Sequence, residues 1–163
     1  MIQLKIKNDE LEKIEPRTLC EEAWQEIASH FTDFKVLSKG KKLKRVAKDK
    51  DIFFEIYFQA NRYNNKDSIE FIPHIGIYSK SIKRAGINNG FIYGGDLGSL
   101  SSRKPHAWWQ LAGASYKYTV EEVSNLIKIH VIPIFNYFED TQANIDRILE
   151  GNCTSESLFT IYT

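Results

Sequence analysis

Two segments of this chain alternate apolar and polar residues along successive positions. The apolar residues of 52–59 all fall on one face: Ile52, Phe54, Ile56 and Phe58. Glu55 and Gln59 fall on the opposite face, and a polar turn over 61–67 leads into a second apolar segment over 69–79. Such alternation is typical of antiparallel strands that are buried on one face only. The two segments therefore predict neighbouring strands of a sheet whose apolar face needs a cover.

Two amphipathic segments can provide that cover. A threonine followed three residues later by a glutamate fits a capping box at 18–21 and again at 119–122. These signals predict one helix over 19–31 and a second helix over 120–138. The apolar residues of the first helix form a single stripe: Leu19, Ala23, Trp24, Ile27, Ala28 and Phe31. Pro133 lies inside the second helix, where we expect a kink or a break.

Proline and glycine shape the expectations for the middle of the chain. Pro73 removes one backbone donor from the strand over 69–79, which suggests an edge position or a bulge. Residues 79–85 can form a short helical turn. The segment 86–106 is rich in glycine and serine, and it predicts a long surface loop that holds a short strand at 91–93. Long loops of this kind are often functional.

The length and composition indicate one folded unit. The chain has 163 residues, of which 42% are hydrophobic and 13% aromatic, so it can bury a substantial core. We expect a single globular domain over 1–163. The fold class is α+β, with an antiparallel sheet of about four to six strands and helices packed on one face. Near the ends, residues 2–6 can add an edge strand and 141–150 can form a last helix.

Composition also indicates where the protein works and what it lacks. Cys20 and Cys153 show no paired spacing, so neither a disulfide framework nor a zinc site is expected. No apolar core of a signal peptide and no membrane-spanning run is visible. We therefore expect a cytoplasmic protein that has no metal, cofactor or membrane partner. The net charge of +1 argues against a dedicated nucleic-acid binder.

The charges are nevertheless segregated along the chain. Seven acidic residues lie in the first segment: Asp9, Glu10, Glu12, Glu15, Glu21, Glu22 and Glu26. Seven basic residues follow in the next: Lys39, Lys41, Lys42, Lys44, Arg45, Lys48 and Lys50. One interpretation is two solvated faces. The other is that one of these faces docks an oppositely charged partner.

One group of residues could carry acid–base chemistry. His106 lies near Arg103 in the sequence, and together with Asp96 these residues could act on a phosphate ester. The alternative is a loop histidine with a local hydrogen bond. The glycines of 94–98 are not followed by the lysine of a phosphate-binding loop. No signature of a catalytic site stands out, and we expect a protein that is not an enzyme.

Two further features could bind a macromolecule. Trp108 and Trp109 are adjacent, so in a strand one packs in the core and the other is more exposed. An exposed tryptophan is a typical interface anchor. The basic segment 39–50 could contact phosphates. Its aromatic residues follow in the next strand, however, and are not interleaved with the lysines.

The order of these elements resembles a known bacterial family. The residues that carry the resemblance are Phe34-Lys35 leading to Gly40–Arg45, Tyr57-Phe58-Gln59, Gly76-Ile77-Tyr78-Ser79, Trp108 or Trp109, and Val131-Ile132-Pro133. They are similar to the pattern of domain of unknown function 4304, over roughly 19–140. Small α+β proteins of this kind resemble the immunity proteins of contact-dependent and polymorphic toxin systems. The resemblance implies no catalytic residues.

The leading hypothesis is an immunity protein that binds and blocks a cognate toxin domain, for which a nuclease is the expected class. An acidic surface favours docking on the positive active site of a nuclease, and Glu21, Glu22 and Glu26 are the candidates for it. The rival docking surface comprises Asp96, Arg103, His106, Trp108 and Trp109. The alternatives are a small enzyme that acts on a phosphate-containing substrate and a nucleic-acid-binding module. The sequence leaves the oligomeric state open.

Overall fold

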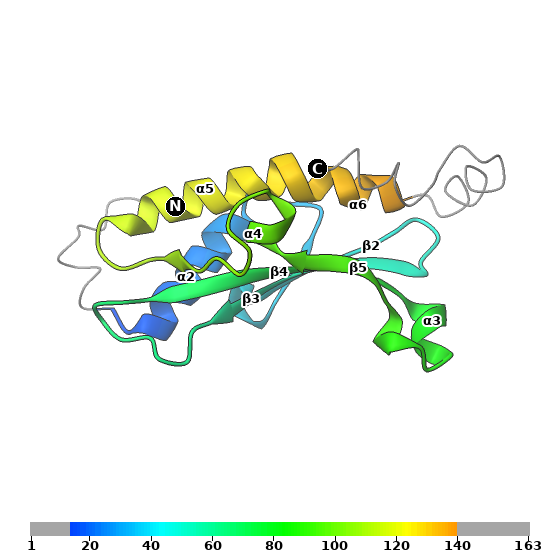
Figure 1. Cartoon of the computed structure of the whole chain (residues 1–163), viewed down its shortest axis with the longest axis horizontal. Helices are drawn as coiled ribbons and strands as arrows, with labels where there is room; N and C mark the ends of the chain where they lie inside the picture. Colours follow the sequence, from blue (N-terminus) through cyan, green and yellow to red (C-terminus); the bar gives the residue numbers. More distant parts are fainter. Residues whose placement is uncertain (1–13, 140–163) are drawn as a thin grey trace.

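An antiparallel sheet forms one layer of the protein, and the long helices form the other (Figure 1). The computed structural model describes residues 14–139. The six strands are β1 (Lys35–Leu37), β2 (Lys42–Val46), β3 (Ile52–Ala60), β4 (Glu70–Ser79), β5 (Phe91–Asp96) and β6 (Trp109–Gln110). The sheet order is β1-β2-β3-β4-β5, and β6 pairs with β4. Every pairing is antiparallel, which confirms the predicted α+β class.

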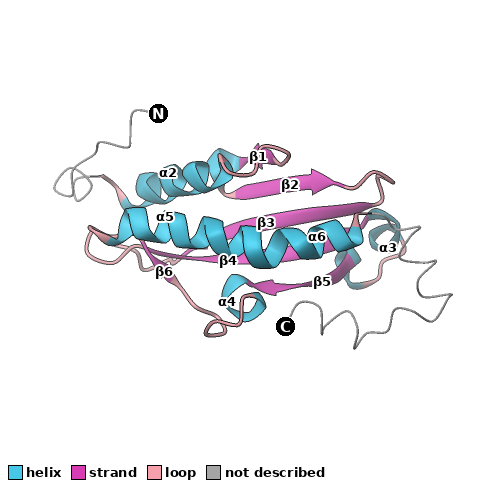
Figure 2. Cartoon of the chain, turned by 90° about the horizontal axis from the view of Figure 1, so that it is seen from above, coloured by secondary structure: helices cyan, strands magenta, loops and turns pink. Residues whose placement is uncertain are grey.

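The long helices gather on one face of this sheet. The α-helices are α2 (Pro16–Ala28), α3 (Lys80–Arg84), α4 (Leu97–Leu100), α5 (Ser115–Leu126) and α6 (Ile132–Phe138). Shorter turns are η2 (Ser38–Gly40), η3 (Asn88–Gly90) and the π-helical η4 (Ile127–Val131). Figure 2 shows α5 and α6 lying across β3 and β4, with α2 alongside α5. The short helix α3 lies beyond the end of β4 on the other side of the sheet (Figure 1), and it confirms the short helical turn expected near residue 80.

The predicted apolar face of the sheet is the one that the helices cover. Ile52, Phe54, Ile56 and Phe58 are buried in one core with residues of α2 and α5. The indole of Trp24 stacks on the Phe58 ring with centroids 5.9 Å apart, as the Phe135 ring of α6 does on Phe54 at 4.8 Å. Ring pairs at such separations stabilise the core by more than the burial of their apolar area alone.

Both predicted capping boxes are wrong. Helix α2 begins at Pro16, because proline has no N–H to satisfy and its fixed φ suits the first turn. It ends at Ala28. Helix α5 begins at Ser115, so Thr119 lies inside it, and the Thr119 hydroxyl donates to the backbone carbonyl of Gln110. This threonine therefore ties α5 to β6.

The expected break near Pro133 is confirmed. The chain passes from α5 through the π-helical η4 into α6, and Pro133 lies in the first turn of α6. A proline in a first turn leaves no interior hydrogen bond unmade. The wider π-helical turn of η4 lies just before this proline and accommodates the break between α5 and α6.

Pro73 does not lie at an edge, because β4 is central. In the β3–β4 ladder it lies opposite Phe58, whose N–H donates in the other direction, to the Lys41 carbonyl at 2.8 Å. The Pro73 nitrogen therefore faces away from β3. On that side β6 pairs as far as Phe71 and β5 pairs from His74. Pro73 falls in the gap between these two strands, where no donor is required.

The segment 86–106 is more ordered than a long loop. It contains η3, the whole of β5 and helix α4, and β5 extends beyond the expected 91–93. A register shift in the β4–β5 ladder falls at Ile77/Tyr78, away from the expected bulge at Pro73. The opposite orientations of the tryptophans are confirmed, since Trp109 is 8% exposed and Trp108 38%. The predicted elements at 2–6 and 141–150 lie outside the described residues.

Candidate functional site

The second face of the sheet is not covered by α2, α5 or α6. Phe54, Ile56 and Phe58 point to the helices, so the residues between them point the other way. We call this side the uncovered face. Its main side chains are Lys35, Lys42, Lys44, Phe53, Glu55, Tyr57, Gln59, Ile72, His74, Tyr78 and Phe91. Phe53 and Ile72 are buried, but neither belongs to the core under the helices.

Aromatic rings form two rows across the uncovered face. In one row the Phe53 and Tyr78 rings stack at 5.2 Å, and Phe91 meets Tyr78 edge-on at 5.7 Å. In the other row the rings of Tyr57 and His74 stack at 6.0 Å. The strand register produces both rows, because Phe53 pairs with Tyr78 and Tyr57 with His74. Phe53 is buried within its row, whereas Tyr57, His74, Tyr78 and Phe91 are partly exposed to solvent.

Two lysines lie over the rings at the β2 side of these rows. Lys44 belongs to β2, and Lys41 immediately precedes this strand. The Lys44 ammonium lies 4.5 Å from the Phe53 ring centre, and the Lys41 ammonium lies 5.2 Å from that of Tyr57. Both separations fall within the range of a cation–π contact. The lysines and aromatic rings that are separate in the sequence are therefore interleaved in space.

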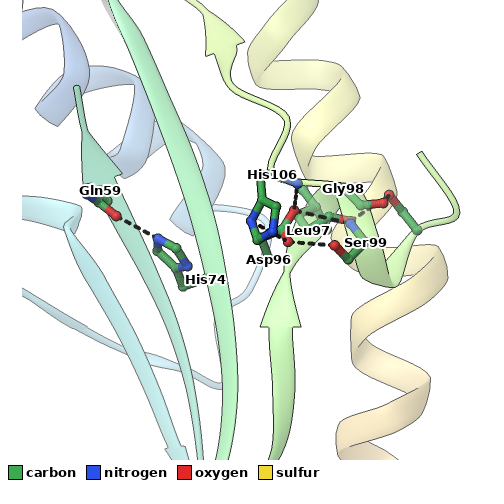
Figure 3. Close-up of polar contacts among 8 residues, drawn as sticks. Gln59, His74, Asp96, Leu97, Gly98, Ser99 and His106 are labelled. Atoms are coloured by element: carbon green, nitrogen blue, oxygen red, sulfur yellow. Dashed lines mark hydrogen bonds and ion pairs between the residues drawn. The ribbon is translucent and has the colours of Figure 1, made fainter. Parts of the chain in front are cut away.

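Gln59 and His74 join β3 to β4 at one end of the uncovered face. The Gln59 Oε1 and His74 Nε2 atoms are 2.8 Å apart (Figure 3). Burial lowers the pKa of His74 below its ordinary 6.5, and nearby Asp96 opposes this effect while His106 reinforces it. A lowered pKa favours the neutral imidazole near neutral pH.

Asp96 ends β5 beside His74 and has its carboxylate fully occupied. It accepts hydrogen bonds from the Ser99 N–H at 3.2 Å, the Ser99 hydroxyl at 2.6 Å and the His106 N–H at 2.9 Å (Figure 3). The His106 Nδ1 lies 3.5 Å from Oδ1. Burial raises the pKa of Asp96, but these hydrogen bonds outweigh burial and lower it. Asp96 thus caps α4 and anchors the following loop.

The predicted acid–base group is brought together only in part. Asp96 and His106 are in contact, whereas the Arg103 guanidinium lies 3.4 Å from Glu122 of α5. The Ser99 hydroxyl donates to Asp96, so the structure does not pair this serine with a histidine base. The His106 side chain is 85% exposed. This geometry fits a loop histidine with a local hydrogen bond.

Replacing Asp96 with alanine should destabilise the protein by about 1–2 kcal/mol, because the cap of α4 and the tether of His106 are lost. The folded pKa is lowered, so the ionised carboxylate adds stability above its ordinary pKa of 3.8, and this stability is lost as the pH falls through the folded pKa. The free energy of unfolding, measured against pH for both proteins, should converge in acid. A constant gap between the two curves would contradict this account.

The acidic candidates of α2 do not form a free surface. The Arg17 Nε atom lies 3.5 Å from Glu21, and Glu22 and Glu26 are half-buried. Burial raises the pKa of the Tyr116 phenol on α5, and the charges of Glu26 and Glu22 raise it further. These two glutamates therefore face α5. The sequence does contain a signal for the uncovered face. It is the polar side of the alternating segment 52–59.

The fold and surface define a two-layer α+β protein with one open sheet face. The chain matches domain of unknown function DUF4304 over residues 37–137, which is more than half of its length. It therefore belongs to this family. Neither the curated proteins nor the solved structures include a significant match. Within 14–139 no cluster of three or more acidic, histidine or cysteine side chains could hold a metal, and no helix could span a membrane.

Proposed function

We propose that this protein is a cytoplasmic immunity protein that binds and neutralises a cognate toxin domain, with no chemistry of its own. The observation that carries the proposal is the uncovered face, on which partly exposed aromatic side chains lie beside lysines. A ring-rich surface of this kind is typical of protein interfaces. Exposed Trp108 and the loop of His106 lie near one end of this face and extend it.

The proposed docking surface differs from the acidic segment of α2. Glu22 and Glu26 face α5, so they are poorly placed to meet a partner. The part of the uncovered face on β1 and β2 has the opposite charge, because Lys35, Lys42 and Lys44 outnumber their neighbour Glu55. Glu70 and Asp96 lie further away, on β4 and β5. The argument for a nuclease, which rested on an acidic docking surface, therefore no longer applies.

The arrangement of the rings supports a protein partner over a nucleic acid. A single-stranded nucleic acid binds by stacking its bases on open ring faces. Here the faces of Phe53 lie between Lys44 and Tyr78, and those of Tyr57 lie between Lys41 and His74. Bases would have to displace these contacts, whereas a protein can pack against ring edges and hydroxyl groups.

The test is to express the products of the genes beside this one in cells, to identify a toxic domain among them, and to measure protection by this protein. Wild-type protein should restore growth and co-purify with the toxin in a fixed ratio. Tyr57→Ala should weaken toxin binding by about 30-fold, as removal of a central aromatic anchor typically does. Tyr118→Ala is the matched control, because Tyr118 is 68% exposed on α5, in the opposite layer.

Two results would contradict the proposal. One is a lack of protection by wild-type protein that is folded and abundant. The other is unchanged binding in Tyr57→Ala, or a greater loss in Tyr118→Ala, with unchanged melting temperatures, which would move the docking surface to another face.

A further inference from the structure

We infer that the uncovered face recognises an acidic protein surface, whose carboxylates contact Lys35, Lys42 and Lys44. We call these three residues the lysine strip. The inference rests on the proposed function in one respect, that the partner is a protein. It adds the chemistry of that partner, which the family does not specify.

The first argument is the distribution of charge. The chain has a net charge of only +1, yet the lysine strip places three positive charges on adjacent strands. Glu55 is the carboxylate among them, and it lies 3.8 Å from Lys42. The Asp96 carboxylate is already bound by Ser99 and His106. On β1 and β2 the three positive charges are therefore offset locally by Glu55, whereas Glu70 and Asp96 lie on β4 and β5.

The second argument is a repulsive pair. Lys35 of β1 lies directly opposite Lys44 of β2 in the antiparallel register. Like charges at opposite positions destabilise a sheet. Within 14–139 neither lysine has a carboxylate within ion-pair distance. The Lys44 ammonium lies over the Phe53 ring and Lys44 also lies opposite Glu55 of β3, so Lys35 is the less compensated charge of the pair. A partner carboxylate beside Lys35 would relieve the repulsion, which favours an acidic ligand.

The third argument is the position of the lysine strip beside the ring rows. Lys42 pairs with Tyr57 in the β2–β3 register, and Lys44 covers Phe53. A partner that covers the rings must also cover these lysines. Burying unpaired charges is costly, so a partner without acidic residues is disfavoured. Charge complementarity thus specifies the partner, while the rings supply apolar contact.

The experiment titrates the isotope-labelled full chain with a short peptide of alternating glutamate and leucine, followed by nuclear magnetic resonance. Saturable shifts should appear at the amides of β1, β2 and β3. The same peptide with lysine in place of glutamate should produce none. Lys35→Glu should weaken binding by about tenfold, as loss of a favourable charge contact does. Lys117→Glu on α5 changes the net charge equally, and it should bind as wild type does.

The melting temperature gives a second and independent readout. Lys35→Glu replaces a repulsive pair by an attractive one with Lys44, so it should melt about 1–3 °C higher than wild type. This variant should therefore be more stable but bind more weakly. A variant that merely unfolds would show the opposite change in melting temperature.

Several outcomes overturn the inference. They are the absence of saturable shifts, equal shifts with the lysine peptide, and tighter binding of an oligothymidine than of the acidic peptide, which would identify a nucleic-acid surface. Full protection by Lys35→Glu would overturn it while the proposed function stands. Failure of wild-type protection together with specific peptide binding would do the reverse.

Discussion

Gly94→Ala is expected to unfold the protein or destabilise it by about 3 kcal/mol or more. Gly94 lies in β5 directly opposite Gly76 of β4. A Cβ atom at position 94 would lie 2.1 Å from the carbonyl oxygen of Ile75. That oxygen belongs to the backbone of a central strand, which pairs on both sides and cannot retreat. The substitution would therefore separate β5 from the sheet, together with α4 and the loop that Asp96 anchors.

Gly95→Ala is the control for this prediction, because it adds the same methyl group one residue further along. A Cβ atom at position 95 would meet only the Leu100 side chain, at 3.9 Å. Such a contact is ordinary packing, so this variant should remain within about 1 kcal/mol of wild type. Denaturant unfolding of the two variants measures the difference. Equal stabilities would show that β5 can move away from β4.

These glycines show why the segment 86–106 was hard to predict. A run of glycine and serine has the local composition of a loop. Gly94 in fact permits the close approach of two strands, and this role depends on the register between β4 and β5. The register is a tertiary property that the local sequence of β5 does not contain. Glycine composition alone therefore underestimates the length of β5.

The central strands were predictable because their signal is strong and local. Each of β3 and β4 alternates over a whole strand, and a one-residue slip would expose the entire apolar row. The helix starts were less predictable, because a threonine can serve a cap or a tertiary contact. Thr119 makes its hydrogen bond to Gln110, in another element. Local capping rules do not take such a tertiary hydrogen bond into account.

The candidate surface was predictable only in fragments. The alternation identifies which residues of β3 face away from the helices. The pairing of Lys42 with Tyr57, however, follows from the β2–β3 register. The acidic segment was misleading for a related reason, since charges that are close in sequence can face another helix, as Glu26 does. The sequence indicated the basic segment 39–50 and the polar side of β3 as separate features, and it did not show that they share one surface.

Arg45→Met is the second substitution with a large expected effect, a loss of about 2 kcal/mol of stability. The hydrogen bonds of the largely buried guanidinium are lost, while its carboxylate partners keep some contact with solvent. The Arg45 side chain is 13% exposed and lies over the rings of Phe34 and Phe54. Its guanidinium lies 3.1 Å from Asp33 and 3.2 Å from Glu139. Methionine can replace part of the packing over the rings, but it leaves both carboxylates without their cation. The side-chain link between β2 and the end of α6 is then lost, and the hydrogen bond from the Lys48 N–H to Glu139, at 3.1 Å, remains.

Arg45→Lys separates charge from geometry in this prediction. Lysine keeps the positive charge, but a single ammonium cannot reproduce a planar group that lies over rings and binds two carboxylates. We therefore expect Arg45→Lys to be less stable than wild type and more stable than Arg45→Met. Arg103→Met is the matched control, because the Arg103 side chain is 57% exposed and its pair with Glu122 is worth less than about 1 kcal/mol. Denaturant unfolding of the three variants gives the comparison. If Arg45→Met proved no less stable than Arg103→Met, Arg45 would contribute nothing to holding α6 on the sheet.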